Sequence, residues 1–350
     1  MASILIEVIY IIVIFVLSLY GFLGFITLIL FLRHRGNAGS PPKVDQSHLP
    51  PVTVQIPIYN ERFVIEKMIE SVIALDYPLD RLQIQIVDDS NDETVDVVRE
   101  CVCTYRSLGY DIEHIRRSDR EGYKAGALAN ALSGATGEFI AIFDADFQPQ
   151  SEYLAKTVPY FVDDPQLGMI QARWGHLNSD QSSLTAAQSI ALDKHFRMEQ
   201  KVRHDARLFP KFNGSAGIWR RSCVDDAGGW RDDTLCEDLC LSTRATLNGW
   251  EFRYMDDLVV PAELPDSIQA YKNQQARWAK GATQCLRLYG IDILTDSKQS
   301  LLGRSYALLA MSAYGTYLLF LILLLLQLPI ICLDIELPPV LFVFTFIGLG

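Results

Sequence analysis

A short apolar stretch that ends in two carboxylates places the strongest limit on the fold of this chain. Residues Phe139 to Phe143 are apolar on both faces of a strand, and Asp144-Ala-Asp146 follows them directly. A strand that is apolar on both faces is typical of the middle of a parallel sheet covered by helices. Open α/β sheets bind ligands at the carboxyl edge of their strands. The stretch therefore predicts an α/β domain with a ligand site beside Asp144 and Asp146.

The two aspartates offer the hard oxygen ligands that Mg²⁺ or Mn²⁺ prefers in proteins. A cation held by Asp144 and Asp146 would in turn bind the oxygens of a diphosphate. The alternative is a polar turn before the next helix, because an Asp-x-Asp motif is short. The rest of the chain has to decide between a metal–diphosphate site and a turn.

Strands and helices alternate around this stretch. Expected strands lie at residues 52–58, 82–87, 112–115, 139–143, 169–174 and 250–254. Helical segments separate the first four, which predicts a doubly wound, mostly parallel sheet with flanking helices. A second acidic pair, Asp88-Asp89, ends the strand at 82–87, so two strands bring carboxylates to one edge. One of that pair could instead cap the helix that begins near Asp92.

Two long apolar segments flank this domain in the sequence. Residues 4–32 are long enough to span a bilayer and lack the basic start and cleavage site of a signal peptide. Arg33, His34 and Arg35 follow, and positive flanks stay in the cytoplasm. We therefore expect a multi-pass integral membrane protein with its N-terminus outside and its catalytic domain in the cytoplasm.

The expected domain boundaries follow from this pattern. They are a membrane helix at 1–35, a linker at 36–51, the cytoplasmic domain at 52–300 and a second membrane helix at 301–333. Residues 340–350 begin a further apolar run that is too short to span as a helix. The expectation is a chain truncated inside a third membrane segment.

Charge and cysteine content exclude other classes of protein. The formal net charge is −11, with 31 basic and 42 acidic residues, whereas a nucleic-acid-binding protein needs a basic face. The seven cysteines are scattered, without the spacing of a disulfide framework or a zinc site. This content fits a reducing compartment and no nucleic-acid partner.

Two further motifs follow in the second half of the domain. Glu237-Asp238 opens an expected helix, where the helix N-terminus alone could favour a carboxylate. Gln274 and Arg277 share a face of a later helix, and Arg277 can pair with phosphate. Trp278 beside them offers a flat apolar face. The alternative for this helix is an amphipathic segment with a tryptophan anchor at the membrane surface.

The order of these motifs resembles that of the membrane-embedded family-2 glycosyltransferases, which include cellulose, chitin and hyaluronan synthases. The likeness is greatest to mannan and xyloglucan-backbone synthases of the cellulose-synthase-like group, and it covers about residues 52 to 290. The segments that carry it are 55–61 (QIPIYNE), 87–90 (VDDS), 122–128 (GYKAGAL), 143–149 (FDADFQP), 212–217 (FNGSAG), 227–230 (AGGW), 237–238 (ED) and 274–278 (QQARW). The resemblance implies a GT-A-type, Rossmann-like domain.

The resemblance also implies roles for particular residues. Asp144 and Asp146 would position Mg²⁺ or Mn²⁺ on the diphosphate of the donor. Asp238 would be the general base that deprotonates the acceptor hydroxyl, which gives transfer with inversion. Trp278 would lie under the acceptor, with Gln274, Arg277 and Glu237 completing the acceptor and diphosphate region.

The remaining expected site residues belong to the donor. Asp88 or Asp89 would hold the base or ribose, and Tyr59 and Glu61 would line the same pocket. Lys124 would meet the phosphates, or else be a solvated lysine. Residues 212–217 could line the acceptor path, since small residues allow close approach, or form a tight turn.

The sequence therefore predicts an inverting, metal-dependent hexosyltransferase that elongates a β-glycan such as a mannan or glucan. UDP-glucose and GDP-mannose are both plausible donors, and the membrane bilayer is a partner. One alternative is a single transfer to a membrane lipid, as in a ceramide or glycerolipid glucosyltransferase. Another is a non-catalytic membrane scaffold or transporter of the same shape, which predicts loss of the acidic residues that are present here.

Overall fold

A single mixed sheet forms the centre of the computed structural model, which describes residues 2–34, 42, 49–339, 341 and 344. Its strands are β1 (Val52–Ile58), β2 (Leu82–Asp88), β3 (Asp111–Arg116), β4 (Phe139–Ile142), β5 (Leu167–His176), β6 (Gly217–Arg220) and β7 (Glu251–Ala262). Their order across the sheet is β3-β2-β1-β4-β6-β5-β7. Because β1 pairs in parallel with both β2 and β4, the carboxyl ends of these three strands meet at one edge.

The prediction of a mostly parallel sheet with flanking helices is confirmed. β3 pairs in parallel with β2, and β7 with β5. The strand β6 was not foreseen, since residues 212–219 were expected to be turn-like. It runs antiparallel between β4 and β5. Four residues are too few for a periodic pattern, and the pairing with β4 depends on contacts across the fold.

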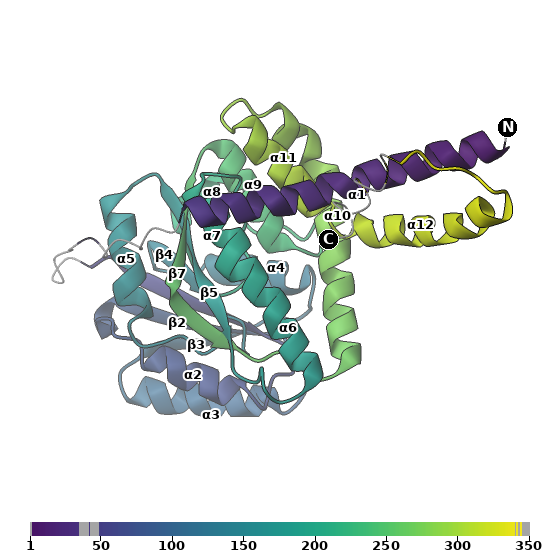
Figure 1. Ribbon diagram of the computed structural model, residues 1–350. Coiled ribbons are helices and arrows are strands. Elements are labelled where there is room, and N and C mark those ends of the chain that lie inside the picture. The colour runs from purple at the N-terminus through teal and green to yellow at the C-terminus, as the bar shows by residue number, and fades with distance from the viewer. Residues whose placement is uncertain (1, 35–41, 43–48, 340, 342–343, 345–350) are drawn as a thin grey trace.

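Helices cover both faces of the sheet (Figure 1). On one face α2 (Ile65–Ile73), α3 (Thr94–Ser107) and α5 (Tyr153–Asp163) pack on β1 and β4 in one hydrophobic cluster. On the other face α4 (Tyr123–Leu132), α8 (Arg221–Asp226) and α9 (Glu237–Asn248) form a second cluster with β4 and β6. Strand β4 contributes Phe139 and Ala141 to the first cluster and Ile140 and Ile142 to the second. Its burial on both faces places Asp144 and Asp146 at the middle of the edge.

The remaining elements connect the sheet to the termini. Between β1 and β2 lies the short η2 (Leu79–Arg81). After β5 the chain forms α6 (Ser183–Asp193), the π-helix η3 (Lys194–Gln200) and α7 (Lys201–Asp205). The long α10 (Ile268–Thr295) follows β7 and leads to α11 (Leu301–Met311) and α12 (Gly315–Cys332).

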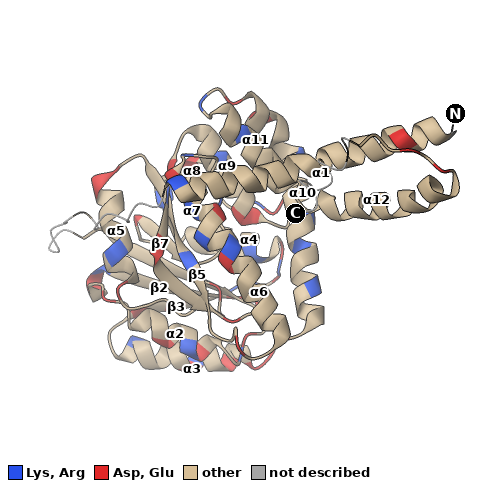
Figure 2. Ribbon diagram, viewed as in Figure 1, with Lys and Arg blue, Asp and Glu red and all other residues tan. Residues whose placement is uncertain are grey.

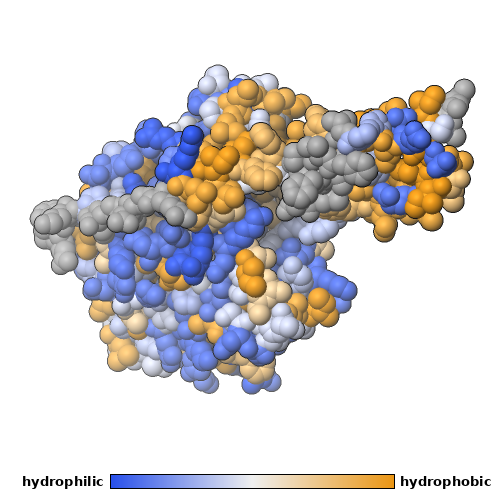
Figure 3. Space-filling view, viewed as in Figure 1, coloured by the Kyte–Doolittle hydropathy of each residue, from blue (hydrophilic) through white to orange (hydrophobic). Residues whose placement is uncertain are grey.

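Within the described part of the chain, two helices are long and apolar enough to cross a membrane by length and composition. These are the span Ser3–Arg33 within α1 (Ala2–Arg33) and the helix α12. The N-terminal part of α1 and α12 project side by side from the domain, in contact with each other (Figure 1). Figure 2 shows this projection almost bare of charged side chains, and Figure 3 shows its surface as largely hydrophobic.

The expected single helix at 301–333 is wrong, because a turn at residues 312–314 separates α11 from α12. The two helices have different partners. Ala307 and Met311 of α11 pack with Phe209 and α9 of the domain, whereas Leu323 and Ile330 of α12 pack with α1. The expected linker at 36–51 and the further segment at 340–350 lie mostly outside the described residues.

Candidate active site

Asp88 and Asp89 lie at the carboxyl end of β2 and are held by basic side chains. Asp88 is buried and accepts hydrogen bonds from the backbone N–H of Ser90 and from Nε2 of His114, each at 2.7 Å. Burial pushes the pKa of Asp88 up, but these hydrogen bonds bring it below its ordinary value. Asp89 pairs with the guanidinium of Arg117 at 3.0 and 2.5 Å.

The capping role considered for this acidic pair is wrong. The first-turn N–H of Thr94 in α3 donates instead to Asp92 Oδ1 at 3.0 Å. Asp88 and Asp89 therefore belong to the edge of the sheet and do not cap α3.

Arg120 joins two of the predicted donor residues. Its guanidinium lies 3.3 Å from the centroid of the Tyr59 ring, a cation–π contact, and 3.9 Å from Asp89 Oδ2. Neither Arg117 nor Arg120 was singled out from the sequence. The signal was a run of basic residues at 116–120 directly after β3, at the edge where the donor phosphates were expected.

Lys124 connects the end of β4 to the loop before β6 and to the start of α9. Its Nζ lies 2.5 Å from Asp144 Oδ1, 3.0 Å from the carbonyl oxygen of Gly214 and 3.9 Å from Glu237 Oε1. Burial lowers the pKa of Lys124, but the negative charges of Asp144 and Glu237 outweigh it and hold the pKa above its ordinary value. The solvated-lysine alternative is wrong, because this ammonium is the centre of an ion-pair cluster.

Carboxylates crowd around Asp146. Burial, together with the charge of Asp144, raises the pKa of Asp146 to about 7. Partial burial and the charge of Asp144 likewise raise the pKa of Glu61 to about 7. Lys124 offsets part of this negative charge at Asp144, but the repulsion that remains keeps both pKa values raised, so the donor set fits a divalent cation.

This metal site would be open rather than closed. Among residues 2–34, 49–339 and the few others that are described, no three His, Cys, Asp or Glu side chains converge on one point. Asp144 and Asp146 would therefore supply part of the coordination shell, and the oxygens of a bound diphosphate the rest.

Asp238 faces this cluster from the first turn of α9. Burial raises the pKa of Asp238, and that of its neighbour Glu237 to about 7. Gly214 lies against the carboxylate with a positive φ of 85°. A Cβ atom at Gly214 would be 3.0 Å from Asp238 Oδ2 and 3.7 Å from Lys124 Nζ. The loop that contains Gly214 thus lies against both Lys124 of α4 and Asp238 of α9.

Replacing Gly214 with alanine is expected to lower kcat for the reaction at this site by tenfold or more. The added Cβ strains the backbone at positive φ and pushes on the Asp238 carboxylate. Steady-state kinetics check this, with Gly109→Ala as the control for positive φ alone, because Gly109 has φ 92° and open space around it. Equal losses in both variants would contradict a specific contact with Asp238.

A cavity of about 490 Å³ adjoins Asp238. It is lined by Asp238, Gln274 and Trp278, together with aromatic side chains of η3, α10 and α12 and of β5. Arg277 is exposed and does not line this cavity, although it lies in the same helix turn. The predicted motif is therefore divided: Gln274 and Trp278 face the cavity, while Arg277 faces elsewhere.

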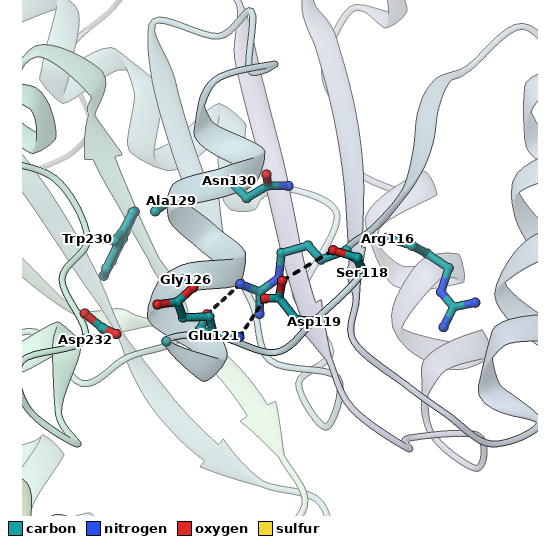
Figure 4. Close-up of a pocket in the computed structure, with 11 residues that line it drawn as sticks. Arg116, Ser118, Asp119, Glu121, Gly126, Ala129, Asn130, Trp230 and Asp232 are labelled. Carbon is teal, nitrogen blue, oxygen red and sulfur yellow. Dashed lines mark hydrogen bonds between the residues drawn. The ribbon is translucent and has the colours of Figure 1, made fainter.

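A second cavity, of about 530 Å³, opens beside Arg117 at the start of α4 (Figure 4). Asp119, Glu121, Asn130, Trp230 and Asp232 contribute to its lining. In Figure 4 Arg116 extends away from Glu121 and Asp232. None of the predicted site residues lines this cavity.

The comparisons with known proteins agree on a family. Residues 50–281 match the model of the family described as "Glycosyltransferase like family 2". Glucomannan 4-beta-mannosyltransferase 9 of Arabidopsis thaliana is 42% identical over 263 residues, which are 74% of this chain and 49% of that protein. Glucomannan 4-beta-mannosyltransferase 1 of Cyamopsis tetragonoloba is 40% identical over 75% of this chain and 50% of its own length. This chain spans about half the length of these curated relatives.

Solved structures show the same fold. A mannosyltransferase from Pyrobaculum calidifontis, in complex with GDP-Man and Mn²⁺, superposes with a TM-score of 0.69 at 22% identity. The alignment covers 98% of this chain and 96% of that one. TarS of S. aureus, residues 1–349 with UDP-GlcNAc, gives a TM-score of 0.56 at 17% identity over 75% and 71% of the two chains.

Proposed function

This chain belongs to glycosyltransferase family 2, and from that premise we propose that it transfers a hexose from a nucleotide-diphosphate sugar to a growing β-glycan, with inversion. The product is of the mannan type, and GDP-mannose is the first donor to test, with UDP-glucose second. The observation that carries the proposal is the ion-pair cluster around Lys124. It joins Asp144 to Gly214 and Glu237, next to a cavity that holds Asp238.

The donor lies along the carboxyl edge of β1, β2 and β4 in this proposal. Arg117, Arg120 and Lys124 supply positive charge for the phosphates, and Tyr59 and the Asp88-Asp89 pair bound the nucleoside. Asp144 and Asp146 hold Mg²⁺ or Mn²⁺. When bound, the cation neutralises charge that develops on the leaving diphosphate.

Asp238 acts on the acceptor. Its carboxylate takes the proton of the acceptor hydroxyl while that oxygen bonds to the anomeric carbon of the donor sugar. The bond from this carbon to the diphosphate oxygen breaks on the opposite face, and the nucleoside diphosphate leaves. The raised pKa of Asp238 makes it a stronger base than an exposed aspartate.

The membrane placement is part of the proposal. α1 and α12 span the bilayer as neighbours, and the basic residues at 33–35 keep the domain on the cytoplasmic side. Support comes from the projection of both helices away from the domain with an almost uncharged surface. The cavity beside Asp238 includes Tyr314 and Tyr317 at the start of α12, so it lies toward this membrane end.

A donor screen with the purified chain tests the function. With Mn²⁺ and a β-1,4-linked mannan oligosaccharide, we expect GDP release from GDP-mannose to exceed UDP release from UDP-glucose. The labelled sugar is expected on the oligosaccharide. Label recovered on a single-sugar, organic-soluble lipid would replace the proposal with the lipid transferase. Consumption of neither donor would refute both.

A further inference from the structure

Lys211 is a charged side chain that the reaction described above does not use. It lies between α7 and β6 and lines the same cavity as Asp238 and Trp278. Its backbone carbonyl accepts a hydrogen bond from Gln200 Nε2 at 2.8 Å. Within the described part of the chain, Lys211 Nζ itself has no hydrogen bond or ion pair. Lys211 is half-buried, and this burial lowers the pKa of its ammonium.

A network of hydrogen bonds fixes the loop that carries Lys211. Asn213 donates from Nδ2 to His195 Nε2 at 3.0 Å and from its backbone N–H to Gln171 Oε1 at 3.0 Å. Its Oδ1 accepts from Gln200 Nε2 at 2.5 Å. His195 completes the network through Nδ1, which donates to Glu199 at 2.9 Å. The position of Lys211 in the cavity wall is therefore set by its backbone and its neighbours and not by any bond of its side chain.

The other charged side chains of the cavity, Asp238 aside, are already paired. Glu199 accepts from His195, and Lys194 Nζ lies 3.5 Å from its other oxygen. Arg203 donates to the carbonyl oxygen of Phe209 at 2.8 Å and stacks on Tyr306 at 4.7 Å. Among the described residues, Asp238 likewise has no ion pair. Lys211 and Asp238 are thus the two charges of the cavity that remain for a ligand.

The rest of the lining indicates the kind of ligand. Aromatic rings of Trp174, Phe196, Trp278, Tyr271 and Tyr314 provide flat apolar surfaces, and the amides of Gln188 and Gln274 provide polar atoms. Flat faces combined with convergent polar groups suit a sugar. An ammonium donates up to three hydrogen bonds and accepts none, which matches the oxygens of sugar hydroxyls.

We propose that Lys211 is an acceptor-binding residue whose ammonium donates hydrogen bonds to hydroxyl oxygens of the sugar that Asp238 deprotonates. This inference rests on the proposed function, since it names the acceptor contact of the same site. It differs from the roles of Asp144, Asp146 and Lys124, which concern the donor.

Replacing Lys211 with methionine tests the proposal in the full-length chain. Methionine keeps an unbranched side chain, one atom shorter than that of lysine, and removes the charge. With GDP-mannose and β-1,4-linked mannotetraose, we expect the KM for mannotetraose to rise about tenfold or more, the loss of a charged hydrogen bond. The KM for GDP-mannose is expected to stay within about twofold of the value for the unchanged chain. The rate of any GDP-mannose hydrolysis without acceptor is expected to stay within the same range.

Stability supplies an independent readout. A residue that serves only the fold lowers Tm when it is lost, whereas removal of a half-buried charge without a partner is expected to leave Tm unchanged or raise it by a few degrees. Lys211→Arg, which keeps the charge, should restore part of the acceptor affinity. Lys67→Met, on the exposed side of α2, is the control and should change none of these values.

Three results would overturn the proposal. One is an unchanged KM for mannotetraose in Lys211→Met, and another is an equal rise in the KM values for acceptor and donor. The third is a lower Tm with no change specific to the acceptor. If the unchanged chain itself transfers nothing, the proposed function fails and this role of Lys211 fails with it. If the unchanged chain transfers the sugar normally, a negative result for Lys211→Met counts against the role of Lys211 alone.

Discussion

Replacing Asp238 with asparagine is expected to lower kcat for glycosyl transfer by roughly 10²- to 10⁴-fold, the range that a general base contributes. The amide keeps the shape of the side chain but cannot take the proton of the acceptor hydroxyl. Because the carboxylate lies beside Gly214 and lines the acceptor cavity, we expect the affinity for nucleotide to remain within about twofold. Transfer rates and nucleotide titrations on the same preparation measure both quantities.

Asp233→Asn is the matched control for this variant. Asp233 lies five residues earlier, is exposed and is placed in no part of the site. Its substitution should leave kcat unchanged. Full activity in Asp238→Asn would show that another group is the base, and Glu237 would then be the first candidate because its pKa is also raised, to about 7.

Asp146→Asn is expected to have the second-largest effect, with opposite consequences for activity and stability. Loss of a cation ligand should reduce transfer at least a hundredfold. Burial and the charge of Asp144 raise the pKa of Asp146 to about 7, so its ionised form destabilises the cation-free fold. Asparagine removes this repulsion and should raise the free energy of unfolding by about 1–2 kcal/mol without a cation.

The gain in stability from Asp146→Asn is expected to depend on pH. An ionised carboxylate whose pKa is higher in the folded than in the unfolded state costs stability, and this cost accumulates as pH rises from about 4 to about 7. The difference in Tm between Asp146→Asn and the unchanged chain should therefore be largest above pH 7 and disappear below pH 4. Addition of Mn²⁺ with GDP should raise the Tm of the unchanged chain only. A variant that is less stable than the unchanged chain at pH 8 would contradict the account.

The local parts of the fold could be predicted from the sequence because they depend on periodicity. Strand β1 was placed at 52–58, as observed. β4 was placed at 139–143, one residue longer than observed, because its apolar character on both faces reflects burial between two helical layers. The position of Asp144 and Asp146 at the edge of the sheet could be predicted for the same reason, because they follow this strand directly.

Other parts depend on contacts between distant segments and leave no periodic signal. β6 exists because four residues pair with β4 and β5, and the break between α11 and α12 follows from their different packing partners. The same holds within the site. Lys124 could be placed near the phosphates from the Gly-rich segment around it, whereas Arg120 over Tyr59 and Lys211 in the acceptor cavity required the tertiary structure.

The anomeric configuration of the first product tests the central claim most directly. The claim is that Asp238, in its cavity, directs the acceptor hydroxyl against the face opposite to the leaving diphosphate. With GDP-mannose, whose sugar is α-linked, and mannotetraose, we predict a new β-linkage by NMR of the isolated pentasaccharide, and a rate of product formation at least about a hundredfold lower from Asp238→Asn. A new α-linkage, or an equal yield from Asp238→Asn, would contradict the account.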